Sequence, residues 1–264
     1  MLELRNISKT FFPGTVNEKL ALDNLNLTLN DGDFVTVIGG NGAGKSTMLN
    51  IIAGVFAPDE GQILIDGKDV TNMPEHRRAS FLGRVFQDPM MGTAANMQLE
   101  ENLSLAYRRG KRRTLRWAIT KAERQEYKEM LQELDLGLEA RLTTRVGLLS
   151  GGQRQAVTLL MATMNKPELL LLDEHTAALD PKTADKVLSL TDKFVSEDNL
   201  TTLMITHNMK DAIAHGNRLI MMNAGRIIFD VSGEEKKKLT VEMLLEQFSK
   251  ASGTEFTSDR ALLG

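Results

Sequence analysis

Residues 34–46 read FVTVIGGNGAGKS, and this stretch decides the fold. Phe34–Ile38 is a short, nearly continuous run of apolar and β-branched residues, which is typical of a strand buried on both faces. The loop that follows, Gly39–Ser46, fits the pattern G-x-x-x-x-G-K-[ST], and a helix is predicted next over Met48–Ala53. This order of strand, loop and helix is the context that the motif requires. The sequence therefore predicts a loop that binds the phosphate groups of a nucleotide.

Each part of this phosphate loop has an expected task. Backbone N–H groups of such a loop coordinate phosphate oxygens, the following helix offers its positive end, and only glycine lets the backbone come so close. We expect Lys45 to reach the β- and γ-phosphates and the Ser46 hydroxyl to ligate Mg²⁺. The alternative is a flexible glycine turn, and the buried strand before the loop argues against it. The residues predicted to bind the nucleotide are Gly39, Gly40, Asn41, Gly42, Ala43, Gly44, Lys45, Ser46 and Thr47.

A second apolar strand, Leu169–Leu172, ends in two carboxylates, Asp173 and Glu174. A parallel strand delivers its last residues to the carboxyl edge of the sheet, where α/β folds bind ligands. We expect Asp173 to hold Mg²⁺, through water, and Glu174 to polarise or deprotonate the attacking water. The alternative, a strand that ends in solvated charges, loses weight because a phosphate loop precedes it. His207 follows a third buried strand and is expected at the same edge.

The rest of the chain alternates strands and helices, which predicts an α/β fold with a mainly parallel sheet and flanking helices. The first 35 residues and a hairpin around Asp66 and Gly67 indicate antiparallel strands on the N-terminal side. A charged segment of helical spacing, about residues 88–149, interrupts the core. After Glu234 the charged tail reads as one amphipathic helix that includes Val241–Phe248.

Composition excludes several classes of protein. With Lys+Arg 32 and Asp+Glu 35, the net charge of -3 gives no basic field for nucleic acid. The absence of cysteine removes disulfides, thiolate nucleophiles and Cys-ligated zinc. No apolar stretch approaches the roughly 20 residues that span a bilayer, and the first residues lack the apolar run of a signal peptide. We therefore expect a cytoplasmic protein that needs a partner for any work at a membrane.

Residues 149–155 read LSGGQRQ, and about 20 residues later comes the strand that ends in Asp173 and Glu174. This arrangement resembles the signature of ATP-binding cassette (ABC) ATPases. The resemblance covers roughly residues 2–231 and implies a P-loop NTPase core with a helical insert. Its elements follow in the family's order: the phosphate loop 39–46, Gln87, the signature 149–155, the acidic strand 169–174, the D-loop Ala177–Asp180 and the switch histidine His207.

The resemblance also implies roles for single residues. Phe11, or its neighbour Phe12, is similar to the aromatic residue that stacks on adenine, although packing in the core is an equal alternative. Gln87 resembles the Mg²⁺-linked residue where the core meets the insert, and with Glu174 and His207 it completes the implied catalytic set. The residues implied to contact nucleotide across a dimer are Ser150, Gly151, Gly152, Gln153 and Asp180.

The family resemblance implies an ATP-binding and ATP-hydrolysing subunit that powers a bacterial transporter, in particular an importer of a small solute such as an amino acid. The alternatives are the single-cassette ATPase of a lipid or peptide exporter and a soluble ABC ATPase outside transport. The implied partners are a second copy in a head-to-tail ATP-sandwich dimer, transmembrane permease subunits and a separate solute-binding protein, with no nucleic acid. The expected location is the inner face of the cell membrane, as a peripheral protein.

The expected domains are an ATPase domain over residues 1–231, with its α/β core at 1–87 and 150–231, and a helical tail over 232–264. In the insert, Met90 and Met91 fall where relatives receive their permease. The basic cluster 108–116 fits either anionic lipid head groups or a solvated loop.

Two residues depart from the family pattern. Gly40 stands where many relatives have proline. His175 stands where proline usually follows the catalytic glutamate, so it either changes the turn or titrates near the dimer interface, or is simply tolerated.

Overall fold

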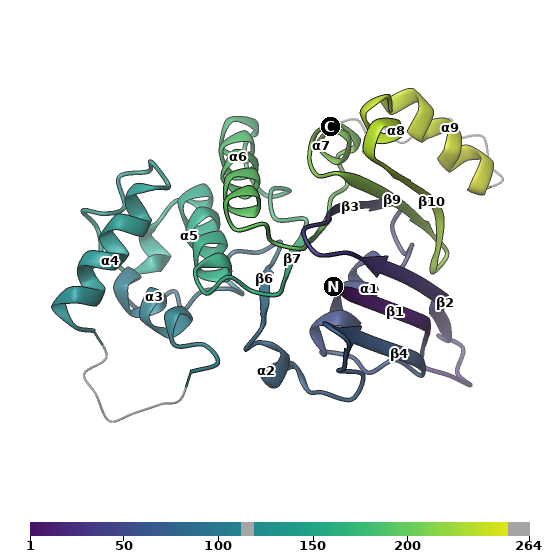
Figure 1. Ribbon diagram of the computed structural model, residues 1–264, viewed down its shortest axis with the longest axis horizontal. Coiled ribbons are helices and arrows are strands. Elements are labelled where there is room, and N and C mark those ends of the chain that lie inside the picture. Colours follow the sequence, from purple (N-terminus) through teal and green to yellow (C-terminus); the bar gives the residue numbers. More distant parts are fainter. Residues whose placement is uncertain (112–118, 253–264) are drawn as a thin grey trace. The chain divides into compact units, whose positions relative to one another are not determined.

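The computed structural model describes residues 1–111 and 119–252 (Figure 1). The chain divides into two compact units, which are considered separately. The first consists of residues 1–78 together with the residues from 199 onward, and the second of residues 79–198. The boundaries expected for the core and the insert stay a prediction.

The first unit begins with an antiparallel sheet in the order β2-β1-β4-β5. Leu2 pairs with Leu29 on one side and with Ile65 on the other. Asp66 and Gly67, both at positive φ, turn the chain between two strands as the hairpin signal predicts. This sheet is the antiparallel N-terminal subdomain that the sequence predicts. Its strands are β1 (Leu2–Phe11), β2 (Lys19–Leu29), β4 (Glu60–Ile65) and β5 (Lys68–Asp69).

A second set of strands in this unit carries the phosphate loop. Strand β3 (Phe34–Gly39) is parallel to both neighbours, β8 (Thr202–Ile205) and β9 (Arg218–Asn223). Residues 34–38 are buried throughout, as expected for a central parallel strand. Strand β10 (Arg226–Ser232) pairs antiparallel with β9. The helices of the unit are α1 (Lys45–Ala53), α2 (Glu75–Arg78), α7 (Met209–Ala214), α8 (Gly233–Lys237) and α9 (Val241–Ser252).

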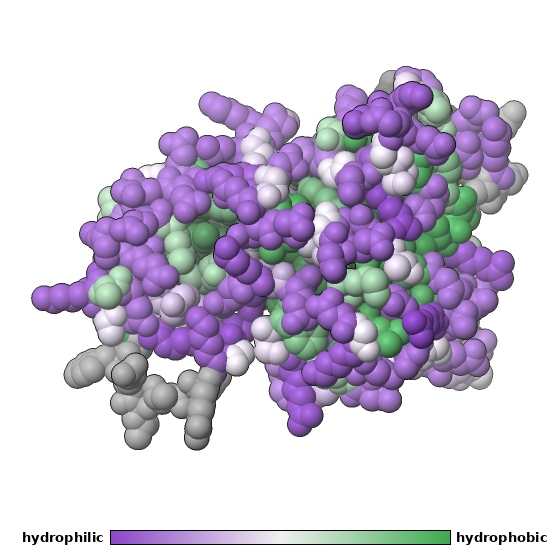
Figure 2. All heavy atoms as spheres, viewed as in Figure 1, coloured by the Kyte–Doolittle hydropathy of each residue, from purple (hydrophilic) through white to green (hydrophobic). Residues whose placement is uncertain are grey.

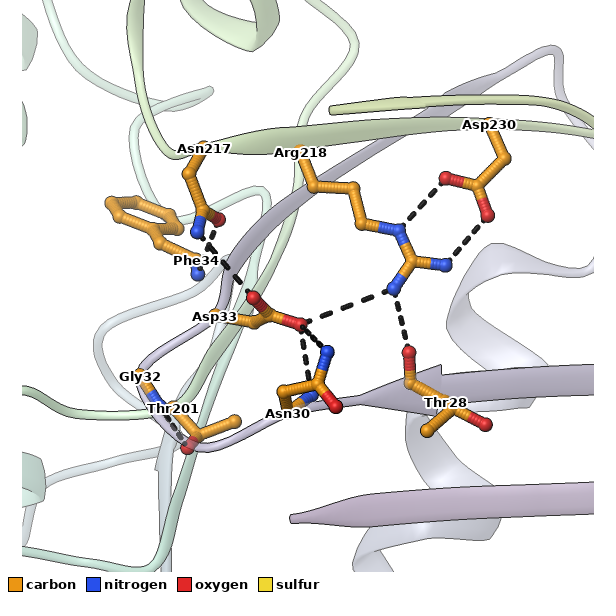
Figure 3. Close-up of polar contacts among 9 residues, drawn as sticks. All are labelled: Thr28, Asn30, Gly32, Asp33, Phe34, Thr201, Asn217, Arg218 and Asp230. Atoms are coloured by element: carbon orange, nitrogen blue, oxygen red, sulfur yellow. Dashed lines mark hydrogen bonds and ion pairs between the residues drawn. The ribbon is translucent and has the colours of Figure 1, made fainter. Parts of the chain in front are cut away.

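A polar network ties the start of β3 to its neighbours (Figure 3). The Arg218 guanidinium donates to both carboxylate oxygens of Asp230, at 2.8 and 2.6 Å, and to the carbonyl of Thr28 at 2.6 Å. The Asp230 hydrogen bonds raise the pKa of Arg218. Asp33 lies 4.0 Å from the same guanidinium and accepts from the backbone N–H of Asn30 at 2.8 Å. The network lies at the edge opposite the phosphate loop and joins β2, β3, β9 and β10.

The second unit pairs β6 (Leu82–Val85) with β7 (Leu169–Asp173) in parallel. Its helical part is held by the Arg124–Glu100 pair, in which two N–H groups donate to two carboxylate oxygens at 2.6 and 2.7 Å. This bidentate geometry is the strong form of an ion pair. The helices are α3 (Leu99–Tyr107), α4 (Lys121–Gln132), the 3₁₀ turn η1 (Val146–Leu148), α5 (Gly151–Thr163) and α6 (Pro181–Glu197).

The C-terminal tail differs from the prediction of one amphipathic helix. It forms two helices, α8 and α9, because Thr240 begins a new helix: its hydroxyl accepts from the N–H of Met243 at 3.3 Å. Lys236 of α8 turns inward and donates to the carbonyls of His215 and Gly216. The chain then restarts a helix at Val241, whose apolar face joins a cluster with β9.

The basic cluster 108–116 lies only partly in the described residues. Arg108 donates to Glu123 at 2.6 Å, and Arg109 donates to the carbonyl of Ala162 at 3.1 Å, so both are bonded within the unit. Arg112, Arg113 and Arg116 lie outside the described residues. Hydrophilic residues predominate on the face that Figure 2 shows. Across residues 1–111 and 119–252, no helix has both the length and the apolar composition to cross a bilayer.

Candidate nucleotide-binding site

Two glycines of the phosphate loop, Gly39 and Gly44, occupy positions that leave no room for a side chain. Gly39 has φ 152°, and a Cβ there would lie 2.3 Å from the carbonyl oxygen of Met222 on β9. Gly44 has φ 100°, and a Cβ would lie 2.6 Å from the carbonyl oxygen of Ala21 on β2. Because both positions combine positive φ with close backbone contact, any side chain there would distort the loop.

Lys45 occupies the centre of this loop. Its side chain is buried, and Nζ donates to the carbonyl of Gly39 at 2.7 Å and to that of Gly40 at 3.2 Å. The ammonium group is thus held by the inner side of the loop. An anion that enters the loop would meet this cation and the N–H groups of α1, whose N-cap Gly44 has no side chain to satisfy them.

The first turn of α1 also presents the predicted metal ligand. Ser46 is exposed and Thr47 is half-buried, whereas Met48 and Leu49 pack in the core. At its other end the helix is fixed by Arg78, a residue to which sequence analysis assigned no role. The Arg78 guanidinium is buried and donates to the carbonyls of Ile51 and Ile52 at 2.8 and 2.7 Å. Burial lowers the pKa of Arg78. The pattern Glu75–Arg78 reads as surface charge, so nothing in the sequence marks this capping role.

The two candidate aromatic residues differ in exposure. Phe11, the last residue of β1, is half-buried, and its ring meets Phe56 edge-on at 5.3 Å between centroids. Phe12 has φ 53° and is 67% exposed. The ring of Phe12 is therefore the more exposed of the two and the more accessible to a base, although the sequence suggested Phe11 first. The stacking role of either ring stays a prediction.

His207 lies at the same sheet edge as the phosphate loop. Strands β3 and β8 are parallel neighbours, and Val37 pairs with Ile205. His207 follows β8 by two residues and is exposed, while the next residue, Asn208, caps α7 by accepting from the N–H of Lys210 at 2.9 Å. The first unit therefore brings together two of the predicted site elements, the loop and His207.

The second unit brings together Asp173 and Gln87. Val85 of β6 pairs with Leu172 of β7, so the two strands end side by side. Strand β6 ends at Val85, and Gln87 follows two residues later as an exposed residue. The Phe86 carbonyl before it accepts from Gln155 of α5 at 3.1 Å. Asp173 is half-buried, and the Arg84 guanidinium lies 3.7 Å from its carboxylate.

Glu174 sits at a strained position between fixed neighbours. Its φ is 45°, a left-handed backbone conformation that is uncommon for residues other than glycine. The following His175 is 2% exposed, and its Nε2 lies 3.1 Å from the Thr191 hydroxyl of α6. Because that hydroxyl donates its single proton to the carbonyl of Val187, the Nε2–H of His175 is the donor. His175 thus anchors the turn in the interior.

The signature segment begins α5. Ser150 is the N-cap, and it accepts from the N–H of Gln153 while the Gln153 side chain accepts from the N–H of Ser150, both at 3.2 Å. Gly151 is exposed and Gly152 is buried. A Cβ at Gly152 would lie 1.9 Å from Cγ2 of Thr183, so α6 packs directly on this glycine.

Asp180 and Arg154 frame the same region. Asp180 caps α6 by accepting from the N–H of Thr183 at 3.1 Å, and the hydrogen bonds from Thr183 lower the pKa of Asp180. Arg154 donates to the carbonyls of Gly147 and Leu149, each at 3.0 Å, and holds the turn before the signature. Arg154 belongs to the signature segment 149–155, but no local pattern in the sequence predicts this structural role.

Known proteins agree with this arrangement. The model of the ABC transporter family matches residues 22–177. The chain is similar to the tyrosine transport ATP-binding protein of Clostridioides difficile, with 46% identity over 95% of this chain and 100% of that protein. It is also similar to the methionine import ATP-binding protein MetN 2 of Enterococcus faecalis, with 36% identity over 86% of this chain, and it spans 64% of that protein.

Solved structures show the same fold. The dimeric structure of MJ0796, a bacterial ABC transporter cassette, has a TM-score of 0.75 and 32% identity over 88% of this chain and 98% of that one. The ADP conformation of MJ1267, another cassette, has a TM-score of 0.77 and 29% identity over 94% of this chain and 98% of that one. With a family match over more than half of its length and a full-length relative at 46% identity, the chain belongs to the ABC transporter family and is an ABC-type ATPase that hydrolyses ATP for transport.

Proposed function

We propose that this ATPase powers the import of an amino acid, of which tyrosine is the first candidate. The observation that carries the proposal is the similarity to a tyrosine transport ATP-binding protein along the whole of that protein and 95% of this chain. Other relatives are a methionine import ATP-binding protein, at 36% identity, and a spermidine/putrescine import ATP-binding protein, at 37% identity. Amino-acid import is favoured over polyamine import because the identity is higher and the alignment complete.

The residues of the two units fit the chemistry of ATP hydrolysis. In the proposal, the loop 39–47 binds the phosphates through its N–H groups and Lys45, and Phe11 or Phe12 stacks on the base. Ser46 and Gln87 would supply oxygen ligands of the kind that Mg²⁺ prefers, and Asp173 would hold the ion through water. Bound Mg²⁺ neutralises charge that develops on the phosphates. Glu174 takes a proton from the attacking water, and His207 orients the γ-phosphate.

The dimer is a further part of the proposal. Ser150, Gly151, Gly152 and Gln153 form a helix N-terminus, which suits an anionic phosphate. The named dimeric structure of the cassette MJ0796 supports a paired state for this family. We assign these residues and Asp180 to the nucleotide of a second copy, in a head-to-tail dimer.

Permease subunits are the proposed membrane partner. Met90 and Met91 are exposed, the latter by 70%, and Leu105 of α3 is exposed in the same segment 88–105. Exposed methionines adapt to varied apolar partners. The permease would hold the chain at the inner face of the membrane, and a separate solute-binding protein would deliver the amino acid. Similarity to the ATP-binding proteins of importers favours this function over the two alternatives, an exporter ATPase and a non-transport ATPase.

Uptake of labelled tyrosine by cells that lack the chromosomal copy of this chain tests the proposal. Wild-type protein should restore uptake, and the Glu174→Gln variant, expressed to the same level, should not. Labelled methionine and spermidine serve as matched substrates. If tyrosine uptake is equal with and without the chain, tyrosine is not the substrate. If the Glu174→Gln variant restores uptake, ATP hydrolysis through Glu174 does not drive it.

A further inference from the structure

The C-terminal helix α9 contacts the phosphate loop through one side chain. A Cβ placed on Gly40 would lie 3.2 Å from Cζ and 3.9 Å from Cε2 of Phe248. Phe248 is 6% exposed and belongs to an apolar cluster with Ile38, Met221 and Leu244. The edge of a buried ring therefore lies against the loop at the second of its glycines.

This contact differs from the other supports of the loop. A Cβ at Gly39 would lie nearest the carbonyl oxygen of Met222, and one at Gly44 nearest that of Ala21, so both glycines lie close to the backbone of neighbouring strands. A Cβ at Gly40 would instead meet only the ring of Phe248 within 4 Å. The carbonyl of Gly40 also accepts from Lys45 Nζ at 3.2 Å, so a shift of Gly40 would move a partner of the phosphate-binding lysine.

A loop rich in glycine loses much conformational entropy when it closes on a ligand. Any contact that restricts the free loop reduces that loss and raises affinity. Phe248 restricts Gly40 because the ring is fixed in the cluster of β9 and α9.

We propose that Phe248 is a positioning residue for nucleotide binding, through which α9 holds the phosphate loop ready for phosphate. The proposal rests on the proposed role of the loop, and it adds a control of nucleotide affinity by the C-terminal helix, which lies outside the segment that the family model matches.

The test is a double-mutant cycle on the full chain, with affinity for ADP as the readout because ADP is not turned over. The Phe248→Ala variant should bind ADP about fivefold more weakly. The Gly40→Ala variant should weaken binding by a similar factor, because its methyl group displaces the ring while its backbone lies outside the left-handed region. The double variant should bind no more weakly than Phe248→Ala alone, since both changes break one contact.

Leu244→Ala is the matched control. Leu244 is fully buried on the same helix and in the same cluster. It should lower the melting temperature at least as much as Phe248→Ala but keep ADP affinity within about twofold of wild type. A merely structural role for Phe248 predicts instead that both variants bind ADP alike.

Wild-type affinity of Phe248→Ala, or additive losses in the double variant, would overturn the proposal. If Phe248→Ala fails to fold, Gly40→Ala and Phe248→Leu, which leave the core filled, decide the question. The Lys45→Ala variant tests the role of the loop separately from the role of Phe248. Unchanged ADP binding by Lys45→Ala would mean that the loop does not bind nucleotide at all.

Discussion

The Nε2–H of His175 donates to the hydroxyl of Thr191 over 3.1 Å, and this hydroxyl donates a hydrogen bond to the carbonyl of Val187. This chain of hydrogen bonds fixes the residue that follows Glu174 to the middle of α6. Since β7 fixes Asp173 on the other side, Glu174 is kept at φ 45° by both neighbours. The hydrogen bond joins the stability of the unit to the placement of the proposed general base.

Replacing Thr191 by valine should reveal that link. Valine keeps the shape but removes the hydroxyl that bonds to Nε2 of His175, and the loss of this buried hydrogen bond should cost about 1–3 kcal/mol of unfolding free energy. ATP turnover should fall as well, because the strained backbone at Glu174 loses a support. Urea unfolding and steady-state ATPase rates measure both effects. Thr191→Ser keeps the hydroxyl and should behave as wild type, and equal stability of the valine and serine variants would contradict the role of the hydrogen bond.

Glu174→Gln should separate binding from hydrolysis. The amide keeps the size and the hydrogen-bonding capacity of the side chain but cannot take a proton from water. We expect wild-type ATP affinity, turnover lowered by about 100-fold or more, and accumulation of an ATP-bound dimer in size-exclusion chromatography. Normal turnover by this variant would move the general base to another residue.

Gly152→Ala tests the packing of the signature on α6. The new Cβ would lie 1.9 Å from Cγ2 of Thr183 but 3.6 Å from its Oγ1, so the methyl group of Thr183 is the obstacle. The variant should lose about 1–3 kcal/mol of unfolding free energy, as overpacked sites do. Adding Thr183→Ser removes Cγ2 and should restore most of the loss. No recovery in the double variant would show that the backbone, and not this methyl group, forbids a side chain at position 152.

The sequence allowed the nucleotide-binding elements to be predicted because their chemistry is local. The strand Phe34–Ile38, the loop after it and the helix to Ala53 lie where the pattern puts them. The acidic strand does so too, with Leu169–Leu172 buried. The family and its ATPase activity were correctly predicted from the same motifs and the signature.

Elements that depend on distant contacts were missed. Strands β9 and β10 were not predicted, since their turn at Ala224 and Gly225 has φ 46° and 78° and lacks the asparagine or aspartate that usually marks such a hairpin. The packing of the tail depends on Lys236, which donates to two carbonyls 20 or more residues away. The contact of Phe248 with Gly40 joins residues that no local pattern relates.

Low pH should destabilise the hairpin of β4 and β5, because protonation of Asp69 weakens the hydrogen bonds that its carboxylate accepts. Its carboxylate accepts from the side chain of Gln62 at 2.8 Å and from the Thr71 hydroxyl at 2.6 Å. These hydrogen bonds, that from Gln62 first, lower the pKa of Asp69 from 3.8 to about 2.

A depressed pKa in the folded state means that the stabilisation is complete above the ordinary pKa and is lost as the pH falls toward about 2. Wild-type stability should therefore fall more steeply between pH 4 and pH 2 than that of Asp69→Asn, in urea titrations at each pH. NMR titration of the Asp69 carboxyl provides the direct measurement, and a midpoint near 3.8 would contradict the prediction.

The last prediction concerns which copy of the chain supplies Ser150 to a nucleotide. Consider a linked dimer in which one copy carries Lys45→Ala and the other carries Ser150→Ala. If each copy builds its own site, both sites are damaged. If sites form head to tail, one site collects both lesions, and the other pairs an intact Lys45 with an intact Ser150.

Occlusion of nucleotide with a γ-phosphate mimic is the appropriate measurement, because it counts the intact sites of each linked dimer. An isologous dimer has two equivalent sites, so the wild-type linked dimer should occlude two nucleotides and the mixed dimer about one. A linked dimer with both substitutions in the same copy is the matched control: it damages each head-to-tail site once and should occlude none. Ser150→Ala suits this comparison because it removes the hydroxyl but leaves the N–H groups at the start of α5 in place. Zero occlusion by the mixed dimer beside two in wild type would rule out the head-to-tail arrangement, and Ser150 would then keep only its observed role as the N-cap that accepts from Gln153.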